Sequence, residues 1–357
     1  MPESSVSNLD GKTPPSVRVH LVAVLPGHER PVDEVRFSPD GALVVSADDH
    51  TVRFWAINTR SLQRTLDLPA SNLTFSPAGA MLALTTVGGI VQLRSSGGDL
   101  LAELPPQGRL ATAVAFSPDG ILIATGDELG RVHLWDTASR QLLLSFHAAP
   151  HGVDNSRGAA TRPVDSICFG PDGTHLATAC NDQRGNIHLW AIAQPGPRAE
   201  WVATAARDLN VFAMTRSPDG ALLAVSDVGN SGVQFLDANA LTRRGQLIVE
   251  EEVFKAIAFS PDGCRLAAAG GAGTVYIWDL TSQRIVARIA AHTDGADYRT
   301  NAELWAIGGI DWSSVGGLIV TSGTSPFTFY DPAIERFTGP ADYTVKLWEV
   351  REDEQGA

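Results

Sequence analysis

The residues of this sequence that could bind a metal ion or carry out catalysis are few and scattered. His147 and His151 are four residues apart and Asp154 follows, so the three side chains could together hold a metal ion. They fall in a polar stretch typical of a loop, whereas residues four apart share one face only in a helix. The sequence has no P-loop, no HExxH and no GxSxG motif, and no GxGxxG motif follows a predicted strand. We therefore expect no catalytic residue, no metal site and no cofactor.

The other polar groups have simpler explanations. His133 and His188 occupy equivalent positions in two similar segments, which repetition explains better than a metal site does. Residues 250–252 are three glutamates, and they indicate either a solvated loop or a patch that recognises a basic partner. Cys168 and Cys180 lie on neighbouring predicted strands, so a disulfide is one interpretation. Reduced thiols are the preferred one, because the chain has no export signal.

The composition argues against several classes of partner. The chain of 357 residues has a formal net charge of −13 and a pI of about 5.1. Binding to nucleic acid or to an anionic membrane needs a basic face instead. No apolar stretch reaches the length of a membrane-spanning helix, and the first residues lack the order of a secretion signal. We expect a cytoplasmic protein that binds neither nucleic acid nor membranes.

A recurring phrase indicates the architecture that positions all these residues. Phe-Ser-Pro-Asp-Gly begins at Phe37 and occurs seven times, intact or altered, at spacings of 38 to 53 residues. The other copies begin at Phe75, Phe116, Phe169, Arg216, Phe259 and Trp312. Proline followed by Asp-Gly is typical of a tight turn. A period of this length indicates one supersecondary unit that is repeated along the chain.

Short apolar segments around each phrase predict strands. In the first unit, one strand precedes the phrase at residues 35–37 and another follows it at 43–45. A third, at 52–55, alternates apolar and polar residues as a half-buried strand does, and a weaker fourth covers 62–66. Four strands in each of seven units predict about 28 strands. No stretch has the pattern of a long amphipathic helix.

These features resemble the WD40-repeat β-propeller family. Five of the seven third strands carry Trp, and Trp135-Asp136 and Trp278-Asp279 match the dipeptide after which the family is named. Gly27-His28 matches the family's Gly-His pair. The resemblance covers roughly residues 17–350. It implies an all-β fold, a seven-bladed β-propeller of four-stranded antiparallel blades.

The resemblance also implies a structural tetrad of His, Ser or Thr, Asp and Trp within a blade. In the first blade the expected members are His28, Ser46, Asp49 and Trp55. The last blade can supply His292, Asp342 and Trp348, with Thr321 or Ser322 as the hydroxyl. The other blades lack at least one member, since Leu129 and Arg184 stand where the pattern has Asp. We expect those blades to depend more on packing.

The two ends of the chain predict how the ring closes. The last third strand ends near Val350, which leaves the seventh unit without a fourth strand, and a spare strand at 17–25 precedes the first unit. Because an unpaired edge is a liability that closure removes, the N-terminal strand should complete the last blade. The expected organisation is a flexible N-terminal tail (1–16), a single propeller (17–350) and a C-terminal tail (351–357).

Three segments depart from the repeat and indicate a binding face. The segments 147–162, 292–303 and 324–341 join strands at the same end of their blades, so they should project from one face, opposite the Ser-Pro-Asp-Gly turns. The acidic residues near that face by strand position are Asp33, Asp48, Glu128, Asp165, Asp182 and Asp227. Tolerated drift is the alternative, because lengthening a surface loop costs little. Residues 327–331 also resemble a third strand, which would form an extra hairpin or displace 345–348.

The leading hypothesis is a non-enzymatic scaffold that docks a neutral or basic protein or peptide on the loop face. The residues expected to contact the partner are Asp33, Arg162, Asp165, Asp297, Tyr298, Arg299, Phe327, Phe329, Tyr330, Arg336 and Phe337. Aromatic side chains with Arg are typical of interface hot spots. The alternatives are a propeller enzyme with an active site at the channel mouth and a structural subunit of a larger assembly.

Overall fold

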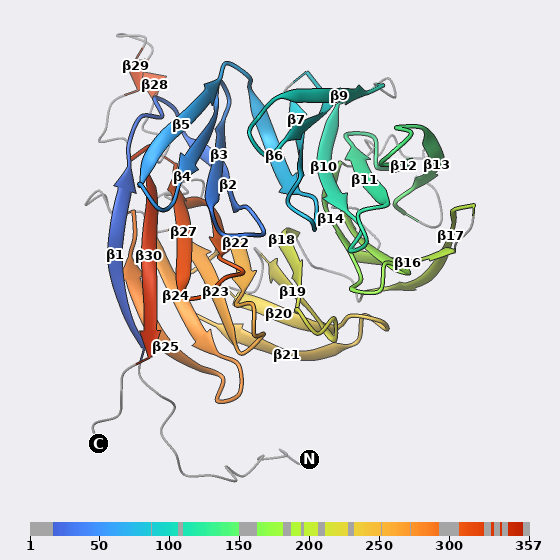
Figure 1. The fold of residues 1–357 in the computed structure, drawn as a ribbon. Helices are drawn as coiled ribbons and strands as arrows, with labels where there is room; N and C mark the ends of the chain where they lie inside the picture. The colour runs from blue at the N-terminus through green and yellow to red at the C-terminus, as the bar shows by residue number, and fades with distance from the viewer. Residues whose placement is uncertain are drawn as a thin grey trace, which may run out of the picture.

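Seven four-stranded antiparallel sheets stand as blades around a ring in the computed structural model (Figure 1). The structure describes residues 17–86, 88–105, 110–149, 163–180, 187–193, 196–205, 211–227, 232–250, 252–271, 273–292, 307–324, 330–331, 336–337 and 342–352. Every regular element in these ranges is a strand. The predicted all-β, seven-bladed architecture is confirmed.

Each of the first six blades takes four strands that are consecutive in the sequence. Blades 1 to 3 consist of β2 (Val32–Phe37), β3 (Leu43–Asp48), β4 (Val52–Ala56) and β5 (Ser61–Leu66); β6 (Ala70–Phe75), β7 (Met81–Thr86), β8 (Val91–Ser95) and β9 (Leu100–Leu104); and β10 (Ala111–Phe116), β11 (Leu122–Asp127), β12 (Arg131–Asp136) and β13 (Leu142–His147). Blades 4 to 6 consist of β14 (Val164–Phe169), β15 (His175–Cys180), β16 (Ile187–Ala193) and β17 (Arg198–Thr204); β18 (Val211–Arg216), β19 (Leu222–Asp227), β20 (Gly232–Asp237) and β21 (Arg243–Ile248); and β22 (Phe254–Phe259), β23 (Arg265–Gly270), β24 (Thr274–Asp279) and β25 (Arg284–Ala290).

The seventh blade joins the two ends of the chain. Its strand order is β26 (Ile307–Trp312), β27 (Leu318–Gly323), β30 (Val345–Glu352) and β1 (Val17–Leu25). Strand β1 pairs antiparallel with β30, from Val17 opposite Glu352 to Leu25 opposite Val345. The N-terminal strand therefore completes the last blade, as predicted. The pairing reaches Glu352, so the first two residues of the predicted C-terminal tail belong to the sheet.

The repeated phrase builds a tight turn between the first and second strands of a blade. In the first copy Ser38 Oγ donates to Asp40 Oδ1 at 2.5 Å and accepts the backbone N–H of Leu43 at 2.9 Å. Gly41 follows with a φ of 69°, a conformation that residues with a side chain rarely adopt. The same Ser-to-Asp bond recurs at Ser117, Ser217 and Ser260. These side chains hold the turns, which explains why the phrase recurs.

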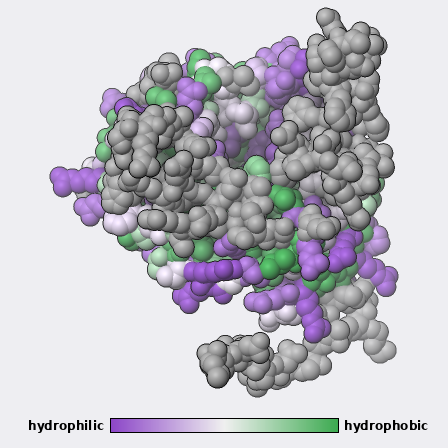
Figure 2. Space-filling model, turned by 180° about the vertical axis from the view of Figure 1, so that it is seen from behind, coloured by the Kyte–Doolittle hydropathy of each residue, from purple (hydrophilic) through white to green (hydrophobic). Residues whose placement is uncertain are grey.

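The hydrophobic core lies between neighbouring blades. One cluster packs Val32 and Trp55 of blade 1 against Leu25, Val320 and Val345 of blade 7. The outermost strand β5 is mostly exposed, whereas β3 is almost wholly buried. Seen from behind, the surface is hydrophilic around much of its periphery, with a hydrophobic area toward the middle (Figure 2). Burial thus decreases from the second strand of a blade toward its rim.

Two open questions from the sequence are settled by the strand register. Strands β28 (Tyr330–Asp331) and β29 (Arg336–Phe337) pair with each other as a separate hairpin, and β30 keeps the third place in blade 7. The extra hairpin is therefore the correct alternative. Cys168 pairs with Ala177 and Cys180 with Val164, and both cysteines are free thiols. The disulfide interpretation is wrong.

Candidate functional site

The mouth of the central channel carries a ring of seven bulged residues, one from the innermost strand of each blade. In every innermost strand the pairing with the second strand shifts at the second residue, which bulges out of register. The bulged residues are Asp33, Ser71, Thr112, Asp165, Phe212, Lys255 and Gly308. We call this set the bulge ring. Because a bulge redirects a side chain and is common beside functional sites, the ring is the candidate site.

The bulge ring lies on the face from which the three long segments arise. The innermost strands begin at this face, and β13 and β25 end at it. Strand β27 also ends there, and the chain continues into the hairpin β28–β29, which stands beyond this end of blade 7 (Figure 1). The Ser-Pro-Asp-Gly turns lie at the opposite ends of the same strands. The bulge ring and the strand ends from which the long segments arise therefore lie on the same face of the propeller.

Two members of the ring form an ion pair across blade 7. Lys255 Nζ of blade 6 lies 3.1 Å from Asp33 Oδ1 of blade 1. Blade 7 lies between them, and it permits this approach because its ring member is Gly308. A Cβ at Gly308 would lie 2.2 Å from the carbonyl oxygen of Val32, so only glycine fits. The glycine lets β26 pack closely against β2, and the ion pair crosses the seam where the ring closes.

The other ring members combine fixed polar groups with one exposed aromatic ring. Thr112 Oγ1 donates to the carbonyl oxygen of Val164 at 2.8 Å, which ties blade 3 to blade 4. Ser71 Oγ lies 3.1 Å from Thr85 Oγ1 within blade 2. Phe212 is 39% exposed, a large fraction for a phenylalanine at the wall of a channel.

Most members of the ring line a cavity of about 530 Å³, which extends into the channel and holds a cluster of charged groups. Arg36 forms an ion pair with Glu34, and Asp311 accepts the backbone N–H of Phe37 at 2.8 Å. Burial raises the pKa of Glu34 to about 7, although Arg36 opposes the shift. Burial also raises the pKa of Asp311. The cluster joins the first and last blades.

The tetrad of blade 1 forms with Asp48 in place of Asp49. His28 Nδ1 lies 2.5 Å from Asp48 Oδ2, and His28 Nε2 lies 2.7 Å from Ser46 Oγ, which accepts Trp55 Nε1–H at 2.8 Å. The expected Asp49 is exposed, and its carboxylate pairs with Arg30. Side chains alternate along a strand, so Asp48 shares the face of Ser46, whereas Asp49 falls in the following turn. Asp48 is also not part of an exposed acidic rim, because it is buried.

The tetrad of blade 7 forms as predicted and selects one of the two candidate hydroxyl groups. His292 lies 2.9 Å from Asp342 Oδ2 and 2.8 Å from Thr321 Oγ1, which also accepts Trp348 Nε1–H at 3.0 Å. Ser322 instead accepts the backbone N–H of Gly309 at 2.9 Å. Lys346 Nζ lies 2.6 Å from the same carboxylate oxygen, and the bonds from His292 and Lys346 hold the pKa of Asp342 well below its usual range.

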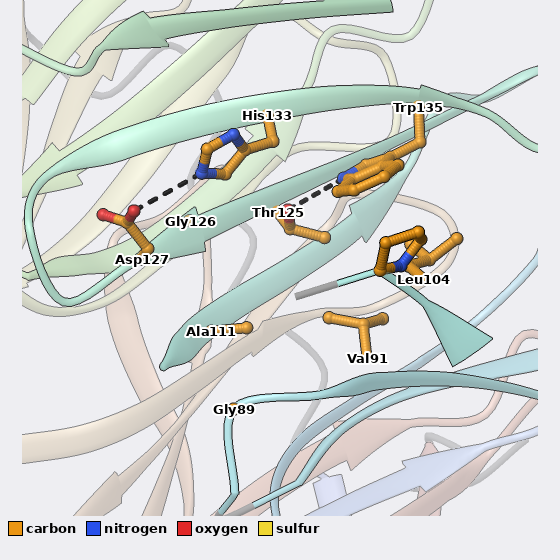
Figure 3. Close-up of a pocket in the computed structure, with 10 residues that line it drawn as sticks. Gly89, Val91, Leu104, Ala111, Thr125, Gly126, Asp127, His133 and Trp135 are labelled. Atoms are coloured by element: carbon orange, nitrogen blue, oxygen red, sulfur yellow. Dashed lines mark hydrogen bonds and ion pairs between the residues drawn. The ribbon is translucent and has the colours of Figure 1, made fainter. Parts of the chain in front are cut away.

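Blade 3 builds a related network from a histidine on its third strand (Figure 3). Asp127 occupies the position of Asp48 and lies 3.4 Å from His133 Nε2, and Trp135 Nε1 donates to Thr125 Oγ1 at 3.0 Å. The prediction that this blade lacks the acid is therefore wrong: Leu129 is not the equivalent position. Both ring nitrogens of His133 have partners within the blade, since Nδ1 also lies 2.7 Å from Ser145 Oγ. His188 has the same kind of contact, with Thr204 Oγ1 at 2.9 Å.

The glutamate run before blade 6 ends in a buried residue. Glu252 is 8% exposed, and the hydroxyl of Tyr276 donates to its Oε2 at 3.2 Å. Gly270 makes room for this carboxylate, because a Cβ there would lie 2.3 Å from Glu252 Oε1. The solvated-loop interpretation and the partner-patch interpretation are therefore both wrong for Glu252, which anchors the chain inside the blade.

The predicted contact residues fall into three sets. Asp33 and Asp165 belong to the bulge ring, and Tyr330, Arg336 and Phe337 lie in the hairpin β28–β29. The predicted residues Arg162, Asp297, Tyr298, Arg299, Phe327 and Phe329 lie outside the described residues. Phe212 and Lys255 are members of the bulge ring that were not predicted from the sequence. A usable signal exists, because every ring member stands four residues before the first residue of its turn phrase.

The described ranges were compared with the requirements of a metal site and of a membrane-spanning helix. They contain no group of three His, Cys, Asp or Glu side chains that could hold a metal ion. The alternative metal site at His147, His151 and Asp154 falls largely outside them. In the same ranges no helix has the length and apolar character needed to cross a membrane.

Comparison with known proteins identifies repeats and relatives. The family model "WD domain, G-beta repeat" matches residues 19–56, 98–136, 155–191 and 250–279. "Target of rapamycin complex subunit LST8" of Rattus norvegicus is 24% identical over 280 residues, which are 74% of this chain and 80% of the relative. "Target of rapamycin complex subunit wat1" of Schizosaccharomyces pombe is 26% identical over 66% of this chain and 73% of its own. "WD repeat-containing protein 1" of Xenopus tropicalis is 22% identical over 79% of this chain but only 40% of its own length.

Proposed function

The chain is a WD40-repeat β-propeller, and from this premise we propose that it is a non-enzymatic scaffold that docks a protein or peptide on its loop face. The observation that carries the proposal is the bulge ring. Seven blades of different sequence each place a bulged residue at the same mouth, beside the anchors of three long loops. A propeller that only filled space would not need a mouth that combines acidic, basic, hydroxyl and aromatic side chains.

The charge and composition of the mouth support a neutral or basic partner. The whole chain has a formal net charge of −13. The ring contains the acids Asp33 and Asp165, the base Lys255, which pairs with Asp33, and the aromatic side chain of Phe212. Aromatic anchors with charged neighbours are typical of residues that dominate binding energy. A peptide with an apolar residue next to Lys or Arg would match this surface. A cytoplasmic location is part of the proposal and rests on the sequence.

The relatives support a role within an assembly. Two of them are named as subunits of a complex, the target of rapamycin complex. We infer that the present chain also acts by holding another protein, whatever the identity of that protein. A permanent assembly would give a single large species in extracts of the native source, whereas a transient partner would leave much of the protein as a monomer on size-exclusion chromatography.

Affinity capture with matched variants tests the docking face. Phe212→Ala alters the ring, and a Tyr330→Ala/Phe337→Ala double variant alters the hairpin. Ile121→Ala serves as the control, since Ile121 is an exposed residue at a Ser-Pro-Asp-Gly turn. We expect the first two variants to reduce capture of the partner about tenfold, which corresponds to about 1.4 kcal/mol each. Their melting temperatures should stay near that of the wild type.

Two results would refute the docking face. Capture that Ile121→Ala weakens as much as Phe212→Ala would place the partner elsewhere. Capture that neither the ring variant nor the hairpin variant changes would show that this face binds nothing under the conditions tested.

A further inference from the structure

Arg216 is a departure from the repeat at the end of the channel opposite to the bulge ring. It ends β18 and directly precedes the turn phrase of blade 5. The other six copies carry an aromatic residue there, namely Phe37, Phe75, Phe116, Phe169, Phe259 and Trp312. Five of these six aromatic side chains are at most 9% exposed. Blade 5 therefore places a permanent positive charge where the other blades place an apolar ring.

The guanidinium group of Arg216 forms no ion pair in the part of the chain that the structure describes, although the carboxylate of Asp172 also lies near Gly170. Its Nε and Nη2 are closed off from water and have no hydrogen-bond partner there. The neighbouring polar group is the thiol of Cys168, which interacts electrostatically with Arg216. Burial raises the pKa of Cys168, so the thiol stays neutral and does not compensate the charge. Arg216 as a whole is half-buried, but two nitrogens of a cation that are closed off from water without a partner are costly and call for an explanation.

A second departure from the repeat fits the first. The residue after the aromatic position is Ser in the other six copies and Gly170 in blade 4. A Cβ at Gly170 would lie 3.2 Å from Arg216 Nη1, closer than side chains normally pack. The guanidinium group therefore lies against the backbone of Gly170, in space that a serine side chain would restrict. Two exceptions in neighbouring blades meet at one point, which indicates that the position of the arginine is accommodated rather than accidental.

Arg216 also lines the channel cavity of about 530 Å³, which is large enough for a small molecule. Two other cations line it. Lys255 pairs with Asp33 and Arg36 pairs with Glu34. Of the three, Arg216 alone forms no ion pair within the described ranges. The carboxylates of Asp165 and Asp311 also line the cavity, and Arg216 is the cation that forms no ion pair within these ranges, at the turn-side end.

We propose that Arg216 anchors a binding site for a small oxyanion, a carboxylate or a phosphate, at the turn-side end of the channel. The planar guanidinium fork matches either group with two parallel hydrogen bonds. On binding, rotation about the side-chain bonds of Arg216 moves the group from the dry seam between blades 4 and 5 into the cavity. The bound anion supplies the missing counter-charge. The site shares the channel cavity with the bulge ring but lies at the opposite end of it, and its test does not involve the partner.

Calorimetric titration and thermal melting with two simple anions test the proposal. Inorganic phosphate and acetate serve as probes at constant pH, with chloride keeping the ionic strength constant. The variant is Arg216→Phe, which restores the aromatic residue of the other blades, and Arg216→Met is a second apolar replacement. The control is Arg284→Phe, the same change at an exposed position of β25. We expect at least one anion to bind the wild type and the control, and to bind both Arg216 variants at least tenfold more weakly.

The two probes also identify the chemistry. A response to phosphate alone assigns a phosphate site, and a response to acetate alone assigns a carboxylate site. In chloride the Arg216→Phe variant should melt above the wild type, because a buried unpaired charge has been removed. Anion binding that is equal in the wild type and in the Arg216 variants, or no binding of either anion to the wild type, would overturn the proposal.

Discussion

At the scale of single residues, the tetrads show how buried polar groups are satisfied inside a β-propeller. In blade 1, His28 Nδ1–H donates to Asp48, and His28 Nε2 accepts the hydroxyl hydrogen of Ser46, which in turn accepts Trp55 Nε1–H. Each member thereby uses its buried hydrogen-bonding groups. Removing one member leaves the others without partners, which costs more than the bond itself.

Asp48 and Asp49 form a matched pair of test positions. We expect Asp48→Ala to lower the free energy of unfolding by about 1 to 3 kcal/mol, because the buried His28 loses its acceptor. Asp49→Ala should change it by less than about 0.5 kcal/mol, because Asp49 is exposed. Urea denaturation at pH 7 measures both. Equal losses in the two variants would contradict the assignment of Asp48 to the tetrad.

The pH dependence of the same pair has a definite sign. Hydrogen bonds from His28 and from the backbone of Thr51 and His50 lower the pKa of Asp48 to about 2, from 3.8, against the effect of burial. An acid whose pKa is lowered by folding stabilises the protein above its unfolded pKa and loses that contribution as the pH falls through its folded pKa. The advantage of the wild type over Asp48→Ala should therefore shrink between about pH 4 and pH 2. An unchanged difference across that window would refute the linkage.

The contribution of Glu34 to the free energy of unfolding changes with pH in the opposite direction. Burial raises its pKa to about 7 from 4.5, so the folded protein holds this proton more tightly than the unfolded chain. Its contribution to the free energy of unfolding falls as the pH rises through that window. The Glu34→Gln variant lacks this decrease. Between pH 4.5 and 7 its free energy of unfolding, measured relative to that of the wild type, should therefore rise by about 1 to 3 kcal/mol. Parallel stability curves for the two proteins would contradict the assignment.

The limits of prediction at this scale are physical. The sequence identified His28, Ser46 and Trp55, but which of two adjacent acids joined them depended on where β3 ended. A shift of one residue turns a side chain to the other face of a sheet. The network of blade 3 was missed for a different reason: its histidine lies on the third strand, across the sheet from Asp127, so the two come together only through strand pairing.

At the scale of elements, β1 is the strand on which closure of the ring depends. Leu25 at its end is 1% exposed and packs in the cluster between blades 1 and 7, whereas Leu21 on the same strand is 50% exposed. We expect Leu25→Ala to lower the free energy of unfolding by about 2 to 5 kcal/mol. Leu21→Ala should cost less than about 0.5 kcal/mol. Urea denaturation distinguishes them, and a small loss for Leu25→Ala would show that β1 is dispensable for the fold.

Most elements could be predicted from the sequence, because turn phrases and alternating strands are local signals. The closure of blade 7 by β1 followed from counting strands at the two ends of the chain. The bulges could not be predicted in this way, since a bulge is a property of the pairing between two strands and leaves the composition unchanged. The hairpin β28–β29 was left open because residues 327–331 have the pattern of a third strand, and the choice depends on competition with β30.

At the scale of the whole molecule, the propeller presents two unlike ends. The bulge ring and the anchors of the long loops occupy one end, and the Ser-Pro-Asp-Gly turns occupy the other. Arg216 lies at the turn end of the channel, and the ion pair between Asp33 and Lys255 lies at the ring end. The two proposals therefore concern separate ends and fail separately. The protein could bind an anion without docking a partner, or dock a partner without binding an anion, and either result would leave the other proposal standing.

Photo-cross-linking from the two ends tests the central claim most directly. A photoreactive phenylalanine analogue replaces Ser71, an exposed member of the bulge ring, or Ile121, an exposed residue at the turn end. Each protein is irradiated in extract of the native source, and adducts are resolved by mass. We predict a discrete protein adduct from position 71 and none from position 121. An adduct of the same mass from position 121 alone would contradict docking on the loop face.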